Sequence, residues 1–265
     1  MSTSTQVAVI IGGASGIGWA TAQLMADRGD TVIIADLDGA AANARAAELG
    51  APATGYRVQV TDEIAMRTLF DTINAEYGPI GAVVDCAGIS RPGTIAELSL
   101  ADWQATVDVC LTGAFLSVKE AARSLRDGGS IVLVASLNGR QPGVAMSAYC
   151  SAKAGVLMLA EVAAMELAPR GIRVNAVNPG FVHTPLTQGA TLVPGLVDEY
   201  VENTPLGRAG TPEDIGQTIA FLTSDAAGWM TGAAIDLNGG AHTMRYPNIV
   251  QRIADMTTTS TTNEG

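Results

Sequence analysis

Short apolar runs alternate with longer amphipathic segments along most of the chain. After Gln6 the sequence reads VAVII, then the glycine cluster GGASGIG, then an Ala-rich segment that ends at Gly29. A Val- and Ile-rich run, a tight turn and a segment with helical periodicity predict a strand, a turn and a helix in that order. A second apolar run, TVIIA at residues 31–35, predicts a strand that leads to Asp36. These features predict the start of a right-handed βαβ unit.

The same alternation continues through most of the sequence. We predict further strands at residues 56–60, 80–86, 130–135, 172–177 and 233–237, and helices at residues 62–77, 101–125 and 149–167. Thr211, Pro212 and Asp214 supply an N-cap, a first-turn proline and a capping-box acid for one more helix. Because no Pro-, Ser- or charge-rich linker interrupts this alternation, we expect one α/β domain. It should be a Rossmann-like doubly wound parallel sheet of about seven strands, with helices on both faces in three layers.

Two segments depart from the alternation. Residues 184–205 mix Thr, Gln, Gly and Pro with apolar residues and have no clear period, so we expect a mobile substrate loop within a domain spanning residues 1–243. Residues 244–265 form a C-terminal extension in which Ile249, Ile253 and Met256 share one helical face. Packing explains this face, but the extension is also a candidate lid over the substrate cleft of its own or a neighbouring subunit. The final residues, TTTSTTNEG, offer no apolar side chain to bury, and we expect disorder there.

Composition narrows the class of protein. The 265 residues are 48% hydrophobic and 15% charged, which indicates a globular protein with a substantial core. A formal charge of -11 argues against nucleic acid or an anionic membrane as partner, because both bind basic surfaces. The N-terminus has no basic region ahead of a long apolar segment, and no apolar run is long enough to span a bilayer. We therefore expect a cytoplasmic protein with no nucleic-acid or membrane partner.

The cysteines and histidines offer no metal site. Three cysteines, Cys86, Cys110 and Cys150, lack C-x-x-C spacing and suit reduced thiols in the cytosol. His183 and His242 are far apart in the sequence and have no ligand-like neighbours. We expect no bound metal, and a surface or packing role for His183.

Tyr149 and Lys153 are candidates for acid–base chemistry. On a helix, residues four apart lie on one face. The Lys153 ammonium would stabilise the Tyr149 phenolate and lower its pKa, which makes the pair a candidate general acid/base. The chain contains only two lysines, Lys119 and Lys153, so such a pair had few chances to arise. The alternative is an exposed helix pair without chemistry.

The first turn and the second strand suggest a dinucleotide site. Gly12, Gly16 and Gly18 lie where the free amides of a helix N-terminus bind pyrophosphate, although their spacing differs from G-x-G-x-x-G. Asp36 would accept hydrogen bonds from ribose hydroxyls and repel a ribose phosphate. Since the neighbouring Ser15 and Leu37 are not basic, we favour NAD over NADP. The alternative for Asp36 is a solvated acid at a strand end.

Together these motifs resemble the short-chain dehydrogenase/reductase family from about residue 6 to residue 241. The family's T-G-x-x-x-G-x-G pattern matches residues 11–18, with isoleucine in place of threonine, and its Pro-Gly segment matches residues 179–180. Its Ser and Tyr-x-x-x-Lys match Ser136, Tyr149 and Lys153. The resemblance implies hydride transfer between NAD and a secondary alcohol or ketone. Tyr149 would transfer the hydroxyl proton, Ser136 would hold the oxygen, and Lys153 would lower the Tyr149 pKa and bond the nicotinamide ribose.

The resemblance and the glycine turn together define a cofactor site and a substrate pocket. The expected cofactor contacts are Gly12, Ser15, Gly16, Ile17, Gly18, Asp36, Leu37, Val60, Cys86, Ala87, Gly88, Tyr149, Lys153, Pro179, Gly180, Val182 and Thr184. The expected substrate pocket contains Ser90, Arg91, Leu137, Asn138, Val144, Met146, Phe181 and Leu186. Most pocket residues are small or apolar, which favours a hydrophobic alcohol or ketone over a polyol or a phosphorylated sugar. Arg91 is a candidate contact for an acidic substrate, although an exposed arginine is the simpler interpretation.

Three positions depart from the family pattern. The family's Asn-Asn-Ala-Gly is replaced by residues 85–88, DCAG, and its Asp-Val pair near the adenine by Gln59 and Val60. The Asn that supports a proton-relay water in the family corresponds to Cys110, and a thiol cannot reproduce the two-way hydrogen bonding of an amide. Three outcomes stay open: a water that bridges to backbone instead, reduced activity, or dinucleotide binding without catalysis. We favour the first because the Ser, Tyr and Lys are all present.

Other functions within the same fold remain as alternatives. One is a catalytically silent NAD-binding regulator. Another is epimerisation or dehydration, which extended relatives perform with Tyr and Lys, although the chain after Pro179 is short for that class. The family commonly forms tetramers through its fifth and sixth helices, and the Ala-rich residues 154–164 suit a helix interface. We therefore expect a homo-oligomer, a tetramer or a dimer, that acts on a small-molecule substrate.

Overall fold

One parallel sheet forms the centre of the computed structural model, which describes residues 5–252 and 254. Its strands are β1 Val7–Ile11, β2 Thr31–Asp36, β3 Thr54–Arg57, β4 Ile80–Asp85, β5 Leu125–Val134, β6 Arg173–Pro179 and β7 Ala234–Leu237. They lie in the order β3-β2-β1-β4-β5-β6-β7, and every neighbouring pair is parallel. The chain reverses its direction of travel across the sheet between β1 and β4, where sheets of this kind bind ligands. The predicted doubly wound sheet is confirmed.

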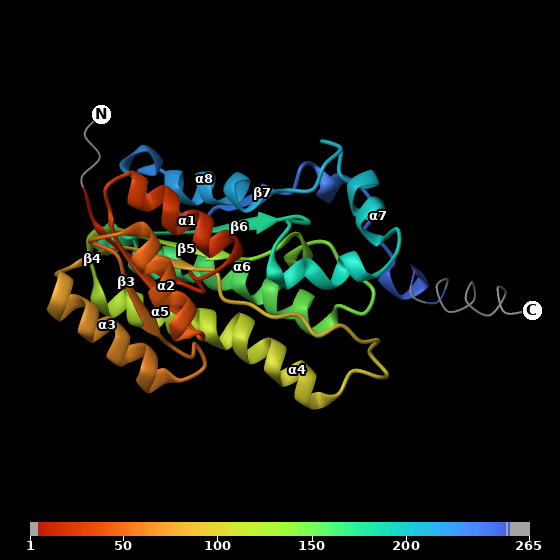
Figure 1. The fold of residues 1–265 in the computed structure, drawn as a ribbon, viewed down its shortest axis with the longest axis horizontal. Helices are drawn as coiled ribbons and strands as arrows, with labels where there is room; N and C mark the ends of the chain where they lie inside the picture. The colour runs from red at the N-terminus through yellow and green to blue at the C-terminus, as the bar shows by residue number, and fades with distance from the viewer. Residues whose placement is uncertain (1–4, 253, 255–265) are drawn as a thin grey trace, which may run out of the picture.

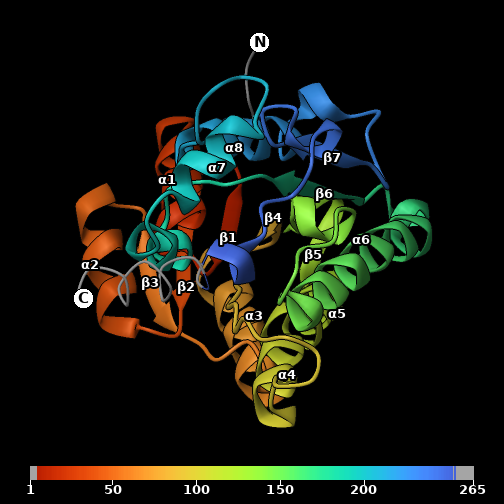
Figure 2. The same ribbon diagram turned by 90° about the vertical axis from the view of Figure 1, so that its right-hand side faces the viewer.

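Helices cover both faces of the sheet (Figures 1 and 2). They are α1 Gly16–Asp27, α2 Gly39–Leu49, α3 Glu63–Tyr77, α4 Leu100–Val107, α5 Gly113–Ser124, α6 Ser147–Leu167, α7 Leu196–Glu202 and α8 Pro212–Leu222. Buried residues of α1, α2 and α8 form one core cluster with the sheet, and those of α3, α5 and α6 form the other. The three predicted layers are therefore present.

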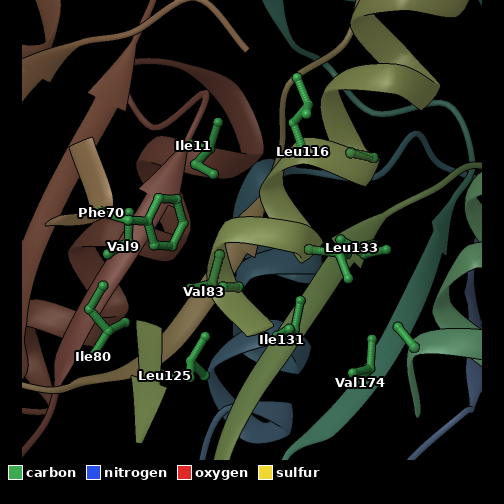
Figure 3. Close-up of a cluster of buried hydrophobic side chains, with 14 of the residues drawn as sticks. Val9, Ile11, Phe70, Ile80, Val83, Leu116, Leu125, Ile131, Leu133 and Val174 are labelled. Carbon is green, nitrogen blue, oxygen red and sulfur yellow. The ribbon is translucent and has the colours of Figure 1, made fainter. Parts of the chain in front are cut away.

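The central strand β1 supplies both clusters by strict alternation. Val7, Val9 and Ile11 belong to the cluster beneath α3, α5 and α6, whereas Ala8 and Ile10 belong to the opposite one. Successive side chains of a strand point to opposite faces, so a strand covered on both sides must be apolar throughout. Figure 3 shows the first cluster, in which Phe70 of α3 faces side chains of the sheet.

Several predicted boundaries differ from the observed ones. The helix α2 was not predicted, because GAAANARAAEL contains few large apolar residues to reveal a period. Asp38 caps it by accepting hydrogen bonds from the amides of Ala40 and Ala41. The predicted helix at residues 101–125 is three pieces, α4, a π-helical turn Asp108–Thr112 and α5. Its last residue instead begins β5, because Leu125 already pairs with Ile80 of β4.

The segment at residues 184–205 contains more regular structure than its sequence suggests. It forms a 3₁₀ helix, Pro185–Leu192, and then α7. Thr184 and Thr187 cap the first of these reciprocally, and Leu196 and Glu199 of α7 are buried. Part of this segment is therefore regular, and the burial that fixes α7 leaves no clear period in the sequence. The mobility and the substrate role of residues 184–205 stay predictions. In the extension, Ile253, Met256 and the final TTTSTTNEG lie outside the described residues.

Helix α6 is the one helix among the described residues whose length and composition would suit a membrane span. With the turn that follows, Ser147–Arg170 is long and apolar enough to cross a membrane by length and composition alone. A core helix of a soluble protein passes the same test. In α6 the residues Ala152, Val156 and Ala160 are buried, and Val156 and Ala160 belong to the core beneath the sheet. Packing against the sheet therefore accounts for the apolar character of this face.

Candidate active site

The glycine-rich turn is closed tightly against the end of β4. Gly12 has φ 70°, and a Cβ there would lie 2.9 Å from the Ala87 amide nitrogen. A Cβ at Gly18 would lie 2.1 Å from the Gly12 carbonyl oxygen, so the start of α1 packs directly on the turn. Only glycine fits either position. No side chain caps the N-terminus of α1, which leaves its first amides available to a phosphate.

Asp36 connects the end of β2 to this turn. Its carboxylate accepts hydrogen bonds from the amide of Ala14 at 3.0 Å and from that of Asp38 at 3.1 Å. Arg45 approaches the same turn, because its Nε donates to the Ala14 carbonyl at 3.4 Å. The Arg45 guanidinium also pairs with Glu48 at 2.7 Å. Sequence reasoning missed Arg45, which lies on the unpredicted helix α2.

A cavity of about 260 Å³ runs from the glycine turn to the end of β6. The predicted cofactor residues that line it are Gly12, Ser15, Gly16, Ile17, Gly18, Cys86, Gly88, Tyr149, Lys153, Pro179, Gly180, Val182 and Thr184. Asp36, Leu37, Val60 and Ala87 do not line it. Sequence reasoning missed Val134, Ala135, Pro185 and Thr187, and it expected Leu186 in the substrate pocket only. A glycine-walled cavity beside a helix N-terminus fits a dinucleotide, since backbone must approach its phosphates closely.

Ser136, Tyr149 and Lys153 meet at one end of this cavity. Ser136 follows β5, and its hydroxyl accepts a hydrogen bond from the Asn138 amide at 3.1 Å. Tyr149 and Lys153 lie in the first two turns of α6, with the ammonium 5.7 Å from the centre of the phenol ring. The Lys153 Nζ is buried and donates to the Val134 carbonyl at 2.7 Å. The ends of β5 and α6 thus bring the predicted serine, tyrosine and lysine together.

Burial and charge oppose each other at Tyr149. Burial raises the pKa of the phenol, while the Lys153 charge and the Ser136 hydroxyl lower it, and burial is the larger effect. The pKa is therefore raised overall, contrary to the lowering expected from the sequence, because loss of hydration outweighs the charge of Lys153. At Lys153 burial lowers the pKa, but the charges of Tyr149, Cys110 and Asp85 together raise it above its ordinary value. Lys153 consequently stays charged.

Cys110 both donates a hydrogen bond to local backbone and accepts one from it. It lies in the π-helical turn, where its Sγ donates to the Ile89 carbonyl at 3.2 Å and accepts from the Ile89 amide at 3.4 Å. Gly88 separates the thiol from the lysine, since a Cβ there would lie 3.8 Å from the Cys110 Sγ and 3.7 Å from the Lys153 Nζ. These partners are local backbone, which the sequence does not reveal, and the effect of Cys110 on turnover stays a prediction.

A second cavity of about 370 Å³ adjoins the first. The two share Ser136, Tyr149, Pro179, Gly180, Leu186 and Thr187 as lining residues. Of the predicted substrate pocket, Ser90, Leu137, Asn138, Met146, Phe181 and Leu186 line this second cavity. Arg91 and Val144 do not: Arg91 is 56% exposed and forms an ion pair with Asp102 at 2.9 Å, and Val144 is half exposed. Both side chains are largely exposed, and neither contributes to the cavity wall.

Aromatic side chains from three distant segments close the second cavity. Tyr200 of α7 stacks on Phe181 at 4.5 Å between ring centres. The Tyr246 hydroxyl donates to Asn138 Oδ1 at 3.0 Å and lies 3.1 Å from the Tyr200 hydroxyl. Sequence reasoning missed both tyrosines, which come from segments without a clear period. Residues 245–247 and 249 of the extension therefore line this cavity in their own chain. Figure 1 shows the blue end of the chain beside α7.

The histidines have packing partners. His183 lies edge-on to Phe181 at 5.4 Å, and the Nδ1 of His242 lies 2.9 Å from Asn238 Oδ1. Among the described residues, no group of three or more His, Cys, Asp or Glu side chains could hold a metal ion.

Comparisons with known proteins place this architecture among oxidoreductases. A family model described as enoyl-(acyl carrier protein) reductase matches residues 12–242. The chain is 42% identical over 240 residues to cis-4-hydroxycyclohexanecarboxylate dehydrogenase of Sinomonas cyclohexanicum, covering 89% of this chain and 96% of that protein. It is 36% identical to (3R)-3-hydroxyacyl-CoA dehydrogenase of Mus musculus, covering 88% and 95%. A crystal structure of a short-chain type dehydrogenase/reductase from Mycobacterium marinum superposes with a TM-score of 0.85 at 34% identity, covering 90% and 96%.

Proposed function

The chain belongs to the short-chain dehydrogenase/reductase family, and from that membership we propose that it transfers hydride between NAD(H) and a hydrophobic secondary alcohol or ketone. The observation that carries this proposal is the meeting of the two cavities at Ser136 and Tyr149. One cavity has the glycine walls that suit a dinucleotide, and the other is mostly apolar. A substrate and a cofactor in these cavities would meet at a proton-transfer group.

The residues at this junction account for the movement of the proton. NAD⁺, when bound, supplies the hydride acceptor. In the oxidising direction Tyr149, as phenolate, takes the hydroxyl proton while the C–H hydride leaves the carbinol carbon. Ser136 donates a hydrogen bond to the substrate oxygen, and Lys153 favours the phenolate by its charge. Reduction follows the same path in reverse.

Asp36 supports NAD as the cofactor. Its carboxylate lies at the end of β2, where it would accept a ribose hydroxyl and repel a ribose phosphate. Two cations approach this region: Arg45 Nε donates to the Ala14 carbonyl, and Arg57 Nε donates to the Leu37 carbonyl beside Asp36. The pairing of Arg45 with Glu48 offsets the first of these charges. We therefore expect kcat/KM for NAD to exceed that for NADP at least about tenfold, since like-charge repulsion at such a site costs more than 1 kcal/mol.

The test of the function is the appearance of NADH absorbance with NAD and a panel of secondary alcohols. The panel should include cyclic alcohols, 4-hydroxycyclohexanecarboxylates and a 3-hydroxyacyl thioester, because the relatives' names specify such substrates. Tyr149→Phe should lower kcat about 100-fold or more, since it removes the general acid/base. NAD binding without turnover of any alcohol or ketone would instead favour the silent regulator.

The proposal also includes a cytoplasmic homo-oligomer, with residues 1–243 as one catalytic domain. Exposed apolar side chains on α5 and α6 support the oligomer: Phe115, Met158, Val162 and Met165 all face solvent in the single chain. These are the helices through which the family commonly associates. Burying such a surface against a second copy would remove it from water.

A further inference from the structure

One cation lies at the mouth of an otherwise uncharged cavity. Arg245 is the only Asp, Glu, Lys, Arg or His among the described residues that line the second cavity. Its side chain is 68% exposed, which places the guanidinium at the rim. Much of the remaining wall is apolar and includes Phe181, Leu186, Val193 and Ile249. A ligand that fills this cavity therefore meets an apolar surface and a single positive charge.

The buried Glu199 carboxylate holds Arg245 but is shared with a second arginine, so it does not fully offset the positive charge of Arg245 at the cavity rim. Glu199 of α7 is only 4% exposed, and its two oxygens contact two arginines. Arg252 Nε lies 2.6 Å from one oxygen, and a terminal nitrogen of Arg245 lies 3.3 Å from the other. One carboxylate is thus shared between two guanidiniums. A guanidinium has five N–H donors, and the contact with Glu199 occupies one nitrogen of Arg245.

The backbone on either side of Arg245 is also fixed. The Met244 carbonyl accepts a hydrogen bond from the Gln141 side chain, and the Tyr246 hydroxyl donates to Asn138. The arginine is therefore anchored before a ligand arrives, which reduces the entropy lost on binding. Arg91, the acidic-substrate contact considered from the sequence, has no such place, because Asp102 holds it outside the cavity.

We propose that Arg245 is a specificity residue that binds a carboxylate of the substrate, so that the substrate is an apolar hydroxy acid or oxo acid. The carbinol or carbonyl carbon lies at Ser136 and Tyr149, the hydrocarbon part fills the cavity, and the carboxylate lies at the rim. Arginine recognises carboxylates by paired, charge-assisted hydrogen bonds. This inference rests on the proposed function for the position of the reacting carbon.

A binding experiment tests the charge without requiring turnover. Cyclohexanecarboxylate and its methyl ester are titrated by calorimetry into the full-length protein with saturating NAD. We expect the acid to bind about tenfold or more tightly than the ester, and Arg245→Gln to remove that difference, as for a lost charge-assisted hydrogen bond. Arg245→Lys should retain part of it, and Arg91→Gln should leave both affinities unchanged.

Kinetics then distinguish recognition from a structural role. With a hydroxy acid from the panel and its methyl ester, Arg245→Gln should raise KM for the acid about tenfold or more and that for the ester less than about twofold. Arg252→Gln, which loosens the Glu199 anchor but leaves the rim cation, should affect both substrates alike. Equal effects of Arg245→Gln on the KM of acid and ester would show that Arg245 only holds the extension to Glu199, and would overturn the proposal. Preference of the enzyme for a hydroxyacyl-CoA over the free hydroxy acid would also overturn it. Arg245-dependent acid binding without any turnover would overturn the proposed function but support the carboxylate site.

Discussion

At the scale of single residues, the chemistry depends on a balance of burial against charge at Tyr149. Burial raises the phenol pKa, and Lys153 is the largest influence that lowers it. Burial favours the neutral phenol overall, and Lys153, which is held nearby by the Val134 carbonyl, offsets part of that effect. A phenol enclosed without this lysine would be a poor base near neutral pH.

We expect Lys153→Met to shift the activity profile toward higher pH. Removing the lysine removes the main influence that lowers the Tyr149 pKa, so a higher pH is needed to form the phenolate, and kcat for alcohol oxidation at neutral pH should fall at least about tenfold. The measurement is kcat/KM for oxidation against pH. Lys119→Met is the matched control, because the only other lysine pairs with Glu63 on the surface. A profile that keeps its inflection in Lys153→Met would contradict this account.

Cys110 should support turnover as it stands. Its thiol donates to and accepts from the Ile89 backbone, so the parent protein should oxidise an alcohol of the panel. Cys110→Ala removes both bonds and should lower stability by about 1–2 kcal/mol and reduce kcat. The measurements are chemical denaturation and turnover in the parent, Cys110→Ala and Cys110→Asn. A parent without activity that Cys110→Asn restores would show that the thiol is the defect.

Asp36→Asn should narrow the preference for NAD. The amide oxygen can still accept from a backbone amide, as the carboxylate does from Ala14, so the turn should persist while the negative charge is lost. The ratio of kcat/KM for NAD to that for NADP should fall about tenfold or more. Arg45→Gln is the companion variant, and it should weaken NADP use in Asp36→Asn without affecting NAD. Equal use of the two cofactors by the parent would refute the role of Asp36.

At the scale of elements, α7 and the C-terminal extension act together as the outer wall of the second cavity. Hydrogen bonds join Tyr246 to Asn138, 108 positions away, and to Tyr200, 46 positions away. Glu199 adds two ion pairs with the extension. The wall is therefore held by a few polar contacts above an apolar space.

Removing residues 244–265 should open this wall. We expect KM to rise, or the range of accepted alcohols to widen, with a smaller change in kcat, because Ser136, Tyr149 and Lys153 lie on other elements. Tyr246→Phe, which removes only the hydroxyl contacts with Asn138 and Tyr200, should have the same direction of effect and a smaller size. Steady-state kinetics over the alcohol panel measure both variants. Unchanged kinetics in the truncated chain would exclude a lid.

At the scale of the whole molecule, the sheet was predictable and the cavity wall was not. A run such as VAVII predicts a strand because both faces of β1 are buried. Tyr149 and Lys153 lie on one helix, so their proximity could be predicted from their spacing in the sequence. Tyr200, Tyr246 and Arg245 reach the cavity only through contacts between distant segments, which leave no local period. Arg45 was not predicted because α2 was not predicted. The alanines of α2 are too small to give the helix a recognisable apolar face in the sequence. Arg91 was predicted in the pocket because it follows β4 and Ser90 in the sequence, but its side chain does not line the cavity.

The proposed oligomer also belongs to this scale. Met158→Glu with Met165→Glu should lower the mass in solution from a tetramer or dimer toward the monomer, because both side chains are exposed on α6 and the charges would be desolvated at an interface. Light scattering after size exclusion measures the mass. Ile64→Glu on α3 is the matched control, an equally exposed apolar residue away from α5 and α6. A parent that is monomeric at micromolar concentration would contradict the proposal.

The π-helical turn at Asp108–Thr112 restricts the insertion and deletion of residues between α4 and α5. The Gly113 amide bonds to the Asp108 carbonyl, one residue further back than in an α-helix. Deleting one codon here would convert this wide turn into an ordinary α-helical turn, and the contact of Cys110 with Ile89 that the wide turn supports would be lost. Surface loops accept such insertions and deletions. Lineages related to this chain should therefore keep the number of residues between α4 and α5 constant while their exposed loops vary.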